Sequence, residues 1–161
     1  MSSKEASAAE TATAILPQEA RNLMLMRLSF PADLAAIPPV RRRLRTLLCE
    51  SGLEAIAYEA ALATQELLAN AVEHGCHGLP PDTEVTVTAE YSGAHLRVTV
   101  HDPSSERPRQ RPESLDMESG RGLSIVGGIA DRWGVEPYAL SPGKVVWLEL
   151  DSPLIRGERA S

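Results

Sequence analysis

The spacing of apolar residues changes along the chain, and each spacing predicts a different kind of secondary structure. Apolar side chains recur at helical spacing over residues 40–50 and again over 53–73, which predicts two consecutive helices. Over residues 85–100 they alternate with polar residues on both sides of a Ser92-Gly93 pair, which predicts a β-hairpin. Weaker alternation predicts a first strand that ends at Pro31.

The second half of the chain combines a loop, a helix and two strands. Residues 103–118 contain three prolines and almost no apolar side chain, which is typical of a long surface loop. Apolar spacing then predicts a short helix over residues 123–131. Two final strands, 133–138 and 144–150, would be joined by a turn at Ser141-Pro142-Gly143.

This order of elements predicts an α+β fold. We expect a two-layer α/β sandwich in which one mostly antiparallel mixed sheet carries helices on one face. The sandwich would occupy residues 21–151. Residues 1–20 and 152–161 lack apolar periodicity and are interpreted as a disordered tail and a flexible tail.

Composition and charge narrow the function classes. The chain has 161 residues and a formal net charge of −6, so it would repel a phosphate backbone. Its aromatic content of 4% argues against a stacking platform for single-stranded nucleic acid. No stretch is long and apolar enough for a membrane span, and the start has no apolar leader. We therefore expect a cytoplasmic protein that binds neither nucleic acid nor membranes.

Two groups of polar residues are candidates for chemistry on predicted elements. Glu66 and Asn70 stand one turn apart on the second helix, where an amide oxygen can hold Mg²⁺ while the carboxylate takes a proton. A solvated helix face is the alternative interpretation. Asp102 ends the second hairpin strand, where a carboxylate can accept a hydrogen bond from the amine of a nucleobase or simply form a turn.

A third candidate is the glycine-rich turn that precedes the helix predicted over residues 123–131. It reads Ser119-Gly120-Arg121-Gly122-Leu123. Glycines let the backbone approach a ligand closely, and the free N–H groups of a helix start favour a phosphate group. Arg121 would add a positive charge, whereas an ordinary flexible loop is the alternative.

The order and spacing of these groups resemble the ATP-binding domain of the GHKL superfamily. The match rests on ExxxNAxxHG in the long helix, an aspartate at the end of a hairpin, and a GxGL turn into a helix. Within the superfamily the chain is most similar to the bacterial anti-sigma-factor serine/threonine kinases, including the stretches RGLSIVGGIADRWGV and KVVWLEL. The resemblance implies a Bergerat-type ATP-binding fold that binds ATP and Mg²⁺.

The resemblance also implies residue roles and partners. Glu66 would be the catalytic base, Asn70 the magnesium ligand in the ATP site, and Asp102 the contact to adenine. The other ATP-binding residues would form a lid: Gly120, Arg121, Gly122 and Leu123. The implied partners are an anti-anti-sigma (STAS-type) protein, which the kinase would phosphorylate, a sigma factor, and a second copy of the chain.

The chain departs from the family's pattern in two places. Where the family has D-x-G, the chain reads Asp102-Pro103-Ser104. The threonine often found near the last strand is replaced within Lys144-Val145-Val146-Trp147. Both changes bear on nucleotide binding, so the alternative to a kinase is a non-catalytic ATP-binding or protein-binding module of the same fold.

Overall fold

A five-stranded antiparallel sheet forms one layer of the protein. The structure is a computed structural model that describes residues 22–104, 117–139 and 142–160. The strand order is β1-β2-β3-β5-β4, and all four neighbouring pairs are antiparallel. The strands are β1 (Leu23–Pro31), β2 (Glu84–Tyr91), β3 (His95–Asp102), β4 (Arg132–Pro137) and β5 (Lys144–Asp151).

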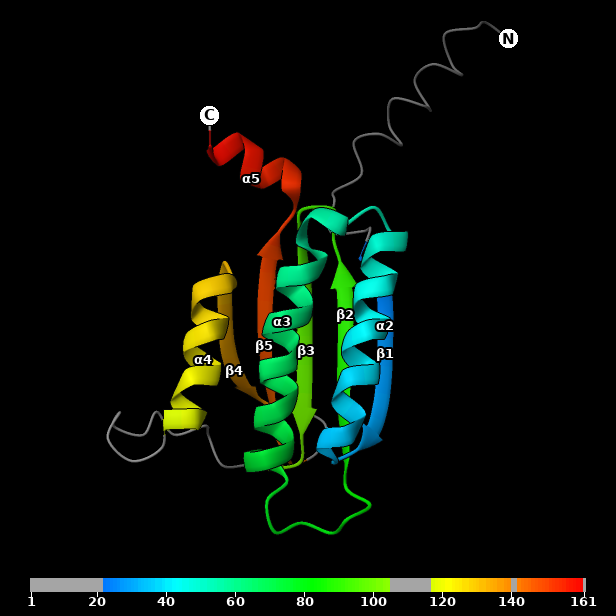
Figure 1. Ribbon diagram of the computed structural model, residues 1–161, viewed down its shortest axis with the longest axis vertical. Helices are drawn as coiled ribbons and strands as arrows, with labels where there is room; N and C mark the ends of the chain where they lie inside the picture. The colour runs from blue at the N-terminus through cyan, green and yellow to red at the C-terminus, as the bar shows by residue number, and fades with distance from the viewer. Residues whose placement is uncertain (1–21, 105–116, 140–141, 161) are drawn as a thin grey trace, which may run out of the picture.

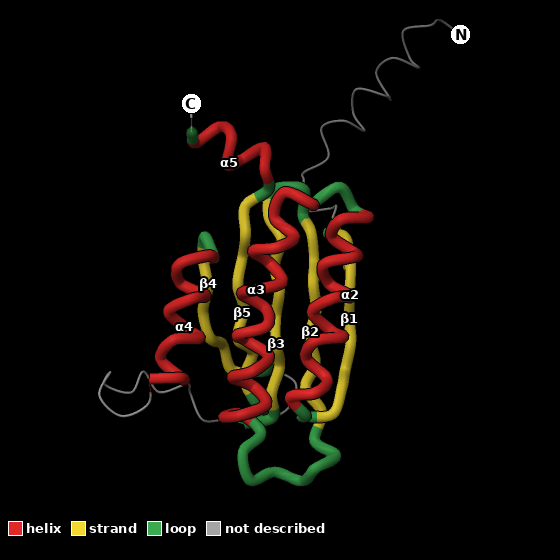
Figure 2. The backbone as a smooth tube through the Cα atoms, viewed as in Figure 1, coloured by secondary structure: helices red, strands yellow, loops and turns green. Residues whose placement is uncertain are grey.

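Three helices form the second layer and cover one face of the sheet, as Figures 1 and 2 show. They are α2 (Ile37–Glu50), α3 (Glu54–Asn70) and α4 (Met117–Ile129). A 3-10 turn, η2 (Leu34–Ala36), leads into α2. The predicted α+β sandwich with helices on one face is confirmed.

The core lies between the two layers because both periodicities direct apolar side chains to the same place. The prolines at the start of α2 suit its first turn, and the helix then buries Val40, Leu44 and Leu48. Alternate residues of β2 and β3, such as Val87 and Val98, are fully buried against the helices. Within the described ranges, no helix combines the length and apolar character that crossing a membrane requires.

Helix α4 begins earlier than the sequence predicts. The prediction of a turn at Ser119-Gly120-Arg121-Gly122 is wrong, because the helix starts at Met117 and includes these residues. Glycine allows a non-helical backbone but does not require one, so a helix can extend through it. Most of the predicted loop, 105–116, and the predicted tail, 1–20, lie outside the described residues.

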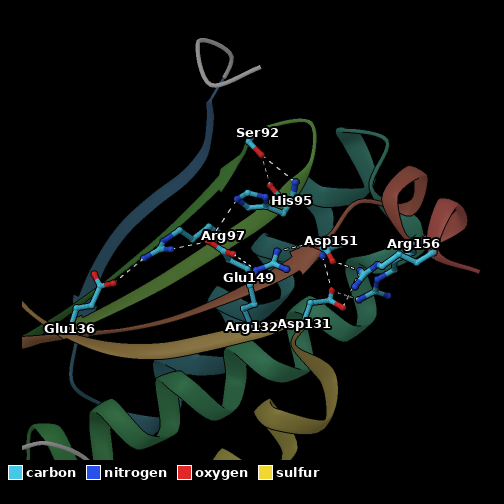
Figure 3. Close-up of polar contacts among 10 residues, drawn as sticks. Ser92, His95, Arg97, Asp131, Arg132, Glu136, Glu149, Asp151 and Arg156 are labelled. Atoms are coloured by element: carbon cyan, nitrogen blue, oxygen red, sulfur yellow. Dashed lines mark hydrogen bonds and ion pairs between the residues drawn. The ribbon is translucent and has the colours of Figure 1, made fainter. Parts of the chain in front are cut away.

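The chain after β5 forms a further helix, α5 (Pro153–Arg159), which the sequence analysis did not anticipate. Arg156 of this helix donates to Glu59 of α3 at 2.9 Å and to Asp131 at 3.2 Å. Arg159 also pairs with Asp151 at the end of β5. Figure 3 shows Arg156 near Asp131. The ion pairs connect α5 to the sandwich, so residues 153–159 have a defined place.

Replacing Arg156 with alanine is expected to loosen α5. Both of its ion pairs are partly exposed, so the loss in unfolding free energy should be small, about 0.5 kcal/mol. The amides of α5 should exchange faster in a hydrogen-exchange measurement, because local opening no longer breaks these contacts. Leu154→Ala is the control, since that side chain is 77% exposed. Equal exchange in the Arg156→Ala and wild-type proteins would contradict the anchoring role.

The face of the sheet that lacks helices carries a network of charged side chains near β3, β4 and β5 (Figure 3). Glu149 accepts hydrogen bonds from Arg97 at 2.9 Å and from Arg132 at 2.7 Å. Burial alone would raise the pKa of Glu149, but these two hydrogen bonds and the nearby charges of His95 and Arg132 together lower it. The Arg97 guanidinium also lies 4.3 Å from the centroid of the Trp147 ring. This part of the open face is therefore internally paired.

Candidate functional site

The residues singled out by sequence meet at one end of the sandwich. Helix α3 ends there, β3 ends there, and both α4 and β5 begin there (Figure 1). The antiparallel pairing of β3 with β5 places Asp102 directly opposite Lys144. The fold thus gathers segments that are up to about 80 residues apart in sequence.

Glu66 and Asn70 lie in the last turns of α3, on neighbouring turns of the same helix face. Both side chains are half-buried, at the border between the core and the solvent. Within the described ranges, neither side chain makes a hydrogen bond or an ion pair with another residue. A carboxylate and an amide oxygen are therefore accessible to a ligand at this position.

A π-helical turn continues α3 beyond Asn70. This turn, η3 (Ala71–Gly75), closes with a hydrogen bond of 2.9 Å from the Cys76 amide to the Ala71 carbonyl. The sequence predicted a regular helix to residue 73 and did not anticipate the wider turn. Such turns are rare and occur often at functional sites. Here the turn brings the Gly75 backbone against the Asp102 side chain.

Asp102 is buried under the helices, at the end of β3. The alternation that buries Val98 and Val100 places Asp102 on the same face, and only 1% of its surface is exposed. Its Oδ1 accepts a hydrogen bond from the Ser104 amide at 2.9 Å. Burial raises the pKa of Asp102, although the Lys144 ammonium and the Ser104 amide both act to lower it.

Gly75 fits against Asp102 because it has no side chain. A Cβ atom at this position would lie 2.5 Å from the Asp102 Cγ and 2.6 Å from its Oδ2. Both distances are far below van der Waals contact, so only glycine fits without a shift of the carboxylate. The glycine of the ExxxNAxxHG motif therefore allows η3 to pack directly against Asp102.

Lys144 is the site residue that the sequence analysis did not assign. Its Nζ lies 3.4 Å from the Asp102 Oδ1, and only 10% of its side chain is exposed. Lys144 lies on the helix-covered face of β5, whereas the half-buried Val145 next to it alternates to the other face. The sequence showed a missing threonine here, but it could not show the ion pair, because β3 and β5 are not consecutive strands.

Gly143 and His101 lie next to this ion pair. Gly143 adopts a φ of 135°, and a Cβ there would lie 2.4 Å from the Asp102 carbonyl oxygen. The His101 ring lies 4.0 Å from the Tyr138 ring, centroid to centroid, and burial lowers the pKa of His101. The Asp102 backbone is therefore closely packed from the β5 side.

The predicted lid residues lie in the first two turns of α4, which starts at the same end of the sandwich. The structure describes the backbone of Gly120, Arg121 and Gly122, but not the position of the Arg121 side chain. Leu123 is half-buried. Residues 120–123 therefore lie at the same end of the sandwich as the end of α3 and the end of β3.

The side chains available as metal ligands limit the kind of metal site that this protein can form. The described ranges contain no cluster of three or more His, Cys, Asp and Glu side chains that could hold a metal. Mg²⁺ often takes only one or two protein ligands and completes its shell with water and substrate phosphates. The accessible Asn70 amide at the end of α3 fits a metal that arrives with a nucleotide.

The chain matches one known protein family over most of its length. Residues 30–150 match the family described as the histidine kinase-like ATPase domain. The chain belongs to this family. The match covers the helices α2, α3 and α4, the strands β2, β3 and β4, nearly all of β5 and the last two residues of β1, so the histidine kinase-like ATPase domain accounts for most of the sandwich. The resemblance to GHKL ATP-binding domains is confirmed, and family membership implies an ATP site.

Two individual proteins are similar to this histidine kinase-like ATPase domain. An uncharacterized protein of Streptomyces coelicolor, SCO4941, is 37% identical over 73 residues, which are 44% of this chain and 67% of that protein. The crystal structure of the RsbU and RsbW domains of Rv1364c from Mycobacterium tuberculosis superposes with a TM-score of 0.57 at 21% identity. That match covers 83% of this chain but only 33% of the solved chain, so it supports the fold.

Proposed function

We propose that this histidine kinase-like ATPase domain is a cytoplasmic, ATP-dependent protein serine/threonine kinase that acts as an anti-sigma-factor-type switch. Its substrate would be an anti-anti-sigma (STAS-type) protein, and a sigma factor would be the other partner. The observation that carries the proposal is the accessible Glu66 and Asn70 pair at the end of α3, beside the buried Asp102. The RsbW domain of the structural neighbour makes partner switching the regulation that fits best.

The chemistry requires mainly positioning from the protein. The serine hydroxyl oxygen of the partner would attack the γ-phosphorus of ATP, and the bond from that phosphorus to the β,γ-bridging oxygen would break. Glu66 would accept the hydroxyl proton, and ADP would leave. Mg²⁺, held through Asn70 and the phosphates, would neutralise developing negative charge.

The remaining predicted residues would hold the nucleotide at its two ends. Asp102 would be at the base end, and the start of α4 with Gly120 and Gly122 would lie near the phosphates. The N–H groups of the first helical turn favour an anionic group. Arg121 and Leu123 would complete this lid, and a second copy of the chain could add a dimer interface.

Glu66→Ala is expected to abolish phosphoryl transfer while nucleotide binding persists. A general base contributes about 100-fold or more to a proton-transfer step, so transfer from labelled ATP to a STAS-type partner should fall by at least that factor. The affinity for ATP with Mg²⁺, measured by calorimetry, should change by less than about threefold, because the proton acceptor makes no required contact with the bound nucleotide.

Glu50→Ala is the matched control for this experiment. Glu50 is exposed at the end of α2, so the same loss of a carboxylate there should leave both transfer and binding unchanged. Unchanged transfer in Glu66→Ala would remove Glu66 from the mechanism.

A second candidate function is a binding module without kinase activity. The observation in its favour is the Lys144 ion pair, which engages the carboxylate that the family uses for the base. This candidate predicts that the wild-type protein binds ATP but transfers no phosphate to any STAS-type partner from the same cell. Transfer to one such partner would exclude it.

A further inference from the structure

We infer that Lys144 makes the base end of this site unselective, so that the protein binds nucleoside triphosphates with little preference for adenine. The inference rests on the proposed nucleotide site and concerns the specificity of that site. In the proposed nucleotide site, the Lys144 ammonium pairs with the Asp102 carboxylate, to which the amino group of adenine would otherwise donate. The class of ligand is a nucleoside triphosphate with Mg²⁺, whatever its base.

The Asp102 carboxylate is already engaged by the protein. Its Oδ1 receives the Ser104 amide at 2.9 Å and faces the Lys144 ammonium at 3.4 Å. The side chains of Asp102 and Lys144 are 1% and 10% exposed, so water screens their attraction weakly. The amino group of adenine is a neutral donor, whereas the Lys144 ammonium carries a full positive charge and so adds Coulomb attraction to the carboxylate. Adenine would therefore have to displace a stronger partner.

Two glycines pack closely against Asp102, one against its carboxylate and one against its backbone. The Gly75 backbone packs against the carboxylate from η3, since a Cβ there would lie within 2.8 Å of three carboxylate atoms. Gly143 packs against the Asp102 carbonyl from β5. Both neighbours are backbone atoms, which yield less readily than a flexible side chain. Movement of Asp102 within the ion pair is thus restricted.

The residues proposed to hold the phosphates and Mg²⁺ are separate from this ion pair. Glu66 and Asn70 lie one to two helical turns before Gly75 and have no bond to Lys144 or Asp102. Binding of the triphosphate with Mg²⁺ at these residues therefore does not depend on the base. Losing the adenine contact should lower base selectivity without removing nucleotide binding.

The test is a calorimetric titration of the full chain with ATP and with GTP, each with Mg²⁺. The wild-type affinities are expected to agree within about fivefold. In Lys144→Thr, which frees the Asp102 carboxylate and supplies the hydroxyl common in the family, ATP affinity should rise about tenfold and GTP affinity should stay unchanged. Lys144→Met, which removes the ammonium but keeps the volume, should shift ATP in the same direction.

Leu154→Thr is the control, because it introduces the same hydroxyl at a 77% exposed position of α5, at the opposite end of β5 from Lys144. It should leave both affinities at the wild-type values. A wild-type preference of more than about fivefold for either nucleotide would overturn the inference, and this measurement does not depend on how the variants fold. Unchanged ATP affinity in a folded Lys144→Thr would overturn it as well.

One further result separates this inference from the proposed function. If the wild-type protein and both Lys144 variants bind neither nucleotide, the nucleotide site itself is refuted, and the inference falls with it. If ATP binds and is transferred to a partner but is strongly preferred over GTP, the proposed kinase stands and only the role of Lys144 is refuted.

Discussion

Lys144→Met is expected to cost about 3 kcal/mol of unfolding free energy at neutral pH, because removing one member of a buried ion pair leaves the other charge without its counterion. Asp102 is 1% exposed and would keep the Ser104 amide and the weaker influence of His101 to stabilise its charge. The volume of the side chain is nearly conserved, so a cavity contributes little. Urea denaturation of the wild-type and variant proteins measures the difference.

The same variant should show a defined dependence on pH. Burial already raises the pKa of Asp102, and removing the Lys144 ammonium removes the largest influence that lowers it. A carboxyl whose pKa is higher in the folded protein than in the unfolded chain adds stability that is fully present below the unfolded pKa and is lost as pH rises through the folded pKa. The penalty of Lys144→Met should therefore be small at about pH 4 and full at about pH 8.

The double variant Asp102→Asn/Lys144→Met is the control for this argument. The asparagine oxygen can still accept from the Ser104 amide, but no charge remains to be desolvated. Replacing both members of a buried ion pair is often nearly neutral, so most of the lost stability should return and the pH dependence should disappear. A double variant as unstable as Lys144→Met, at every pH, would show that the ion pair is not the cause.

Gly75→Ala is expected to lower the unfolding free energy by about 2 kcal/mol, although alanine has the higher helix propensity. The added Cβ would lie 2.5 Å from the Asp102 Cγ, and the carboxylate is held by its ion pair and by the Ser104 amide. Either the π-helical turn or the end of β3 must shift. Chemical denaturation measures the loss.

Gly128→Ala tests the opposite outcome of the same substitution. Gly128 lies near the end of α4, and a Cβ there would meet nothing within 4 Å. Helix propensity alone should then decide, with a gain of up to about 1 kcal/mol. If both alanine variants changed stability in the same direction, the close approach of Gly75 to Asp102 would not be the governing effect.

Much of the architecture follows from short-range patterns. Helical spacing predicted α2 and α3, strict alternation predicted the β2–β3 hairpin, and prolines and glycines marked the turns between them. These patterns work because each element needs one apolar face, whatever it packs against. The start of α4 and the helix α5 were not predicted from the sequence. The start of α4 is rich in glycine and α5 is short and polar, so neither has a clear periodic pattern.

The candidate site also combines features that the sequence predicts with features that only the structure shows. Glu66 and Asn70 could be found from the sequence because their spacing along one helix already makes them neighbours. The π-helical turn after Asn70 could not, since nothing in AVEHG distinguishes it from a regular helical end. The contact of Gly75 with Asp102 depends on that turn and on the end of a strand that follows much later.

The sequence by itself determined the two layers of this protein, the motifs that identify its family, and the pair Glu66 and Asn70. The tertiary structure decided what surrounds Asp102. The strand order β3-β5-β4 inserts β5 beside β3, and only this pairing places Lys144 opposite Asp102 on the buried face. The physical reason is that helix and hairpin contacts join residues close in sequence, whereas an ion pair between non-consecutive strands exists only once the sheet has assembled.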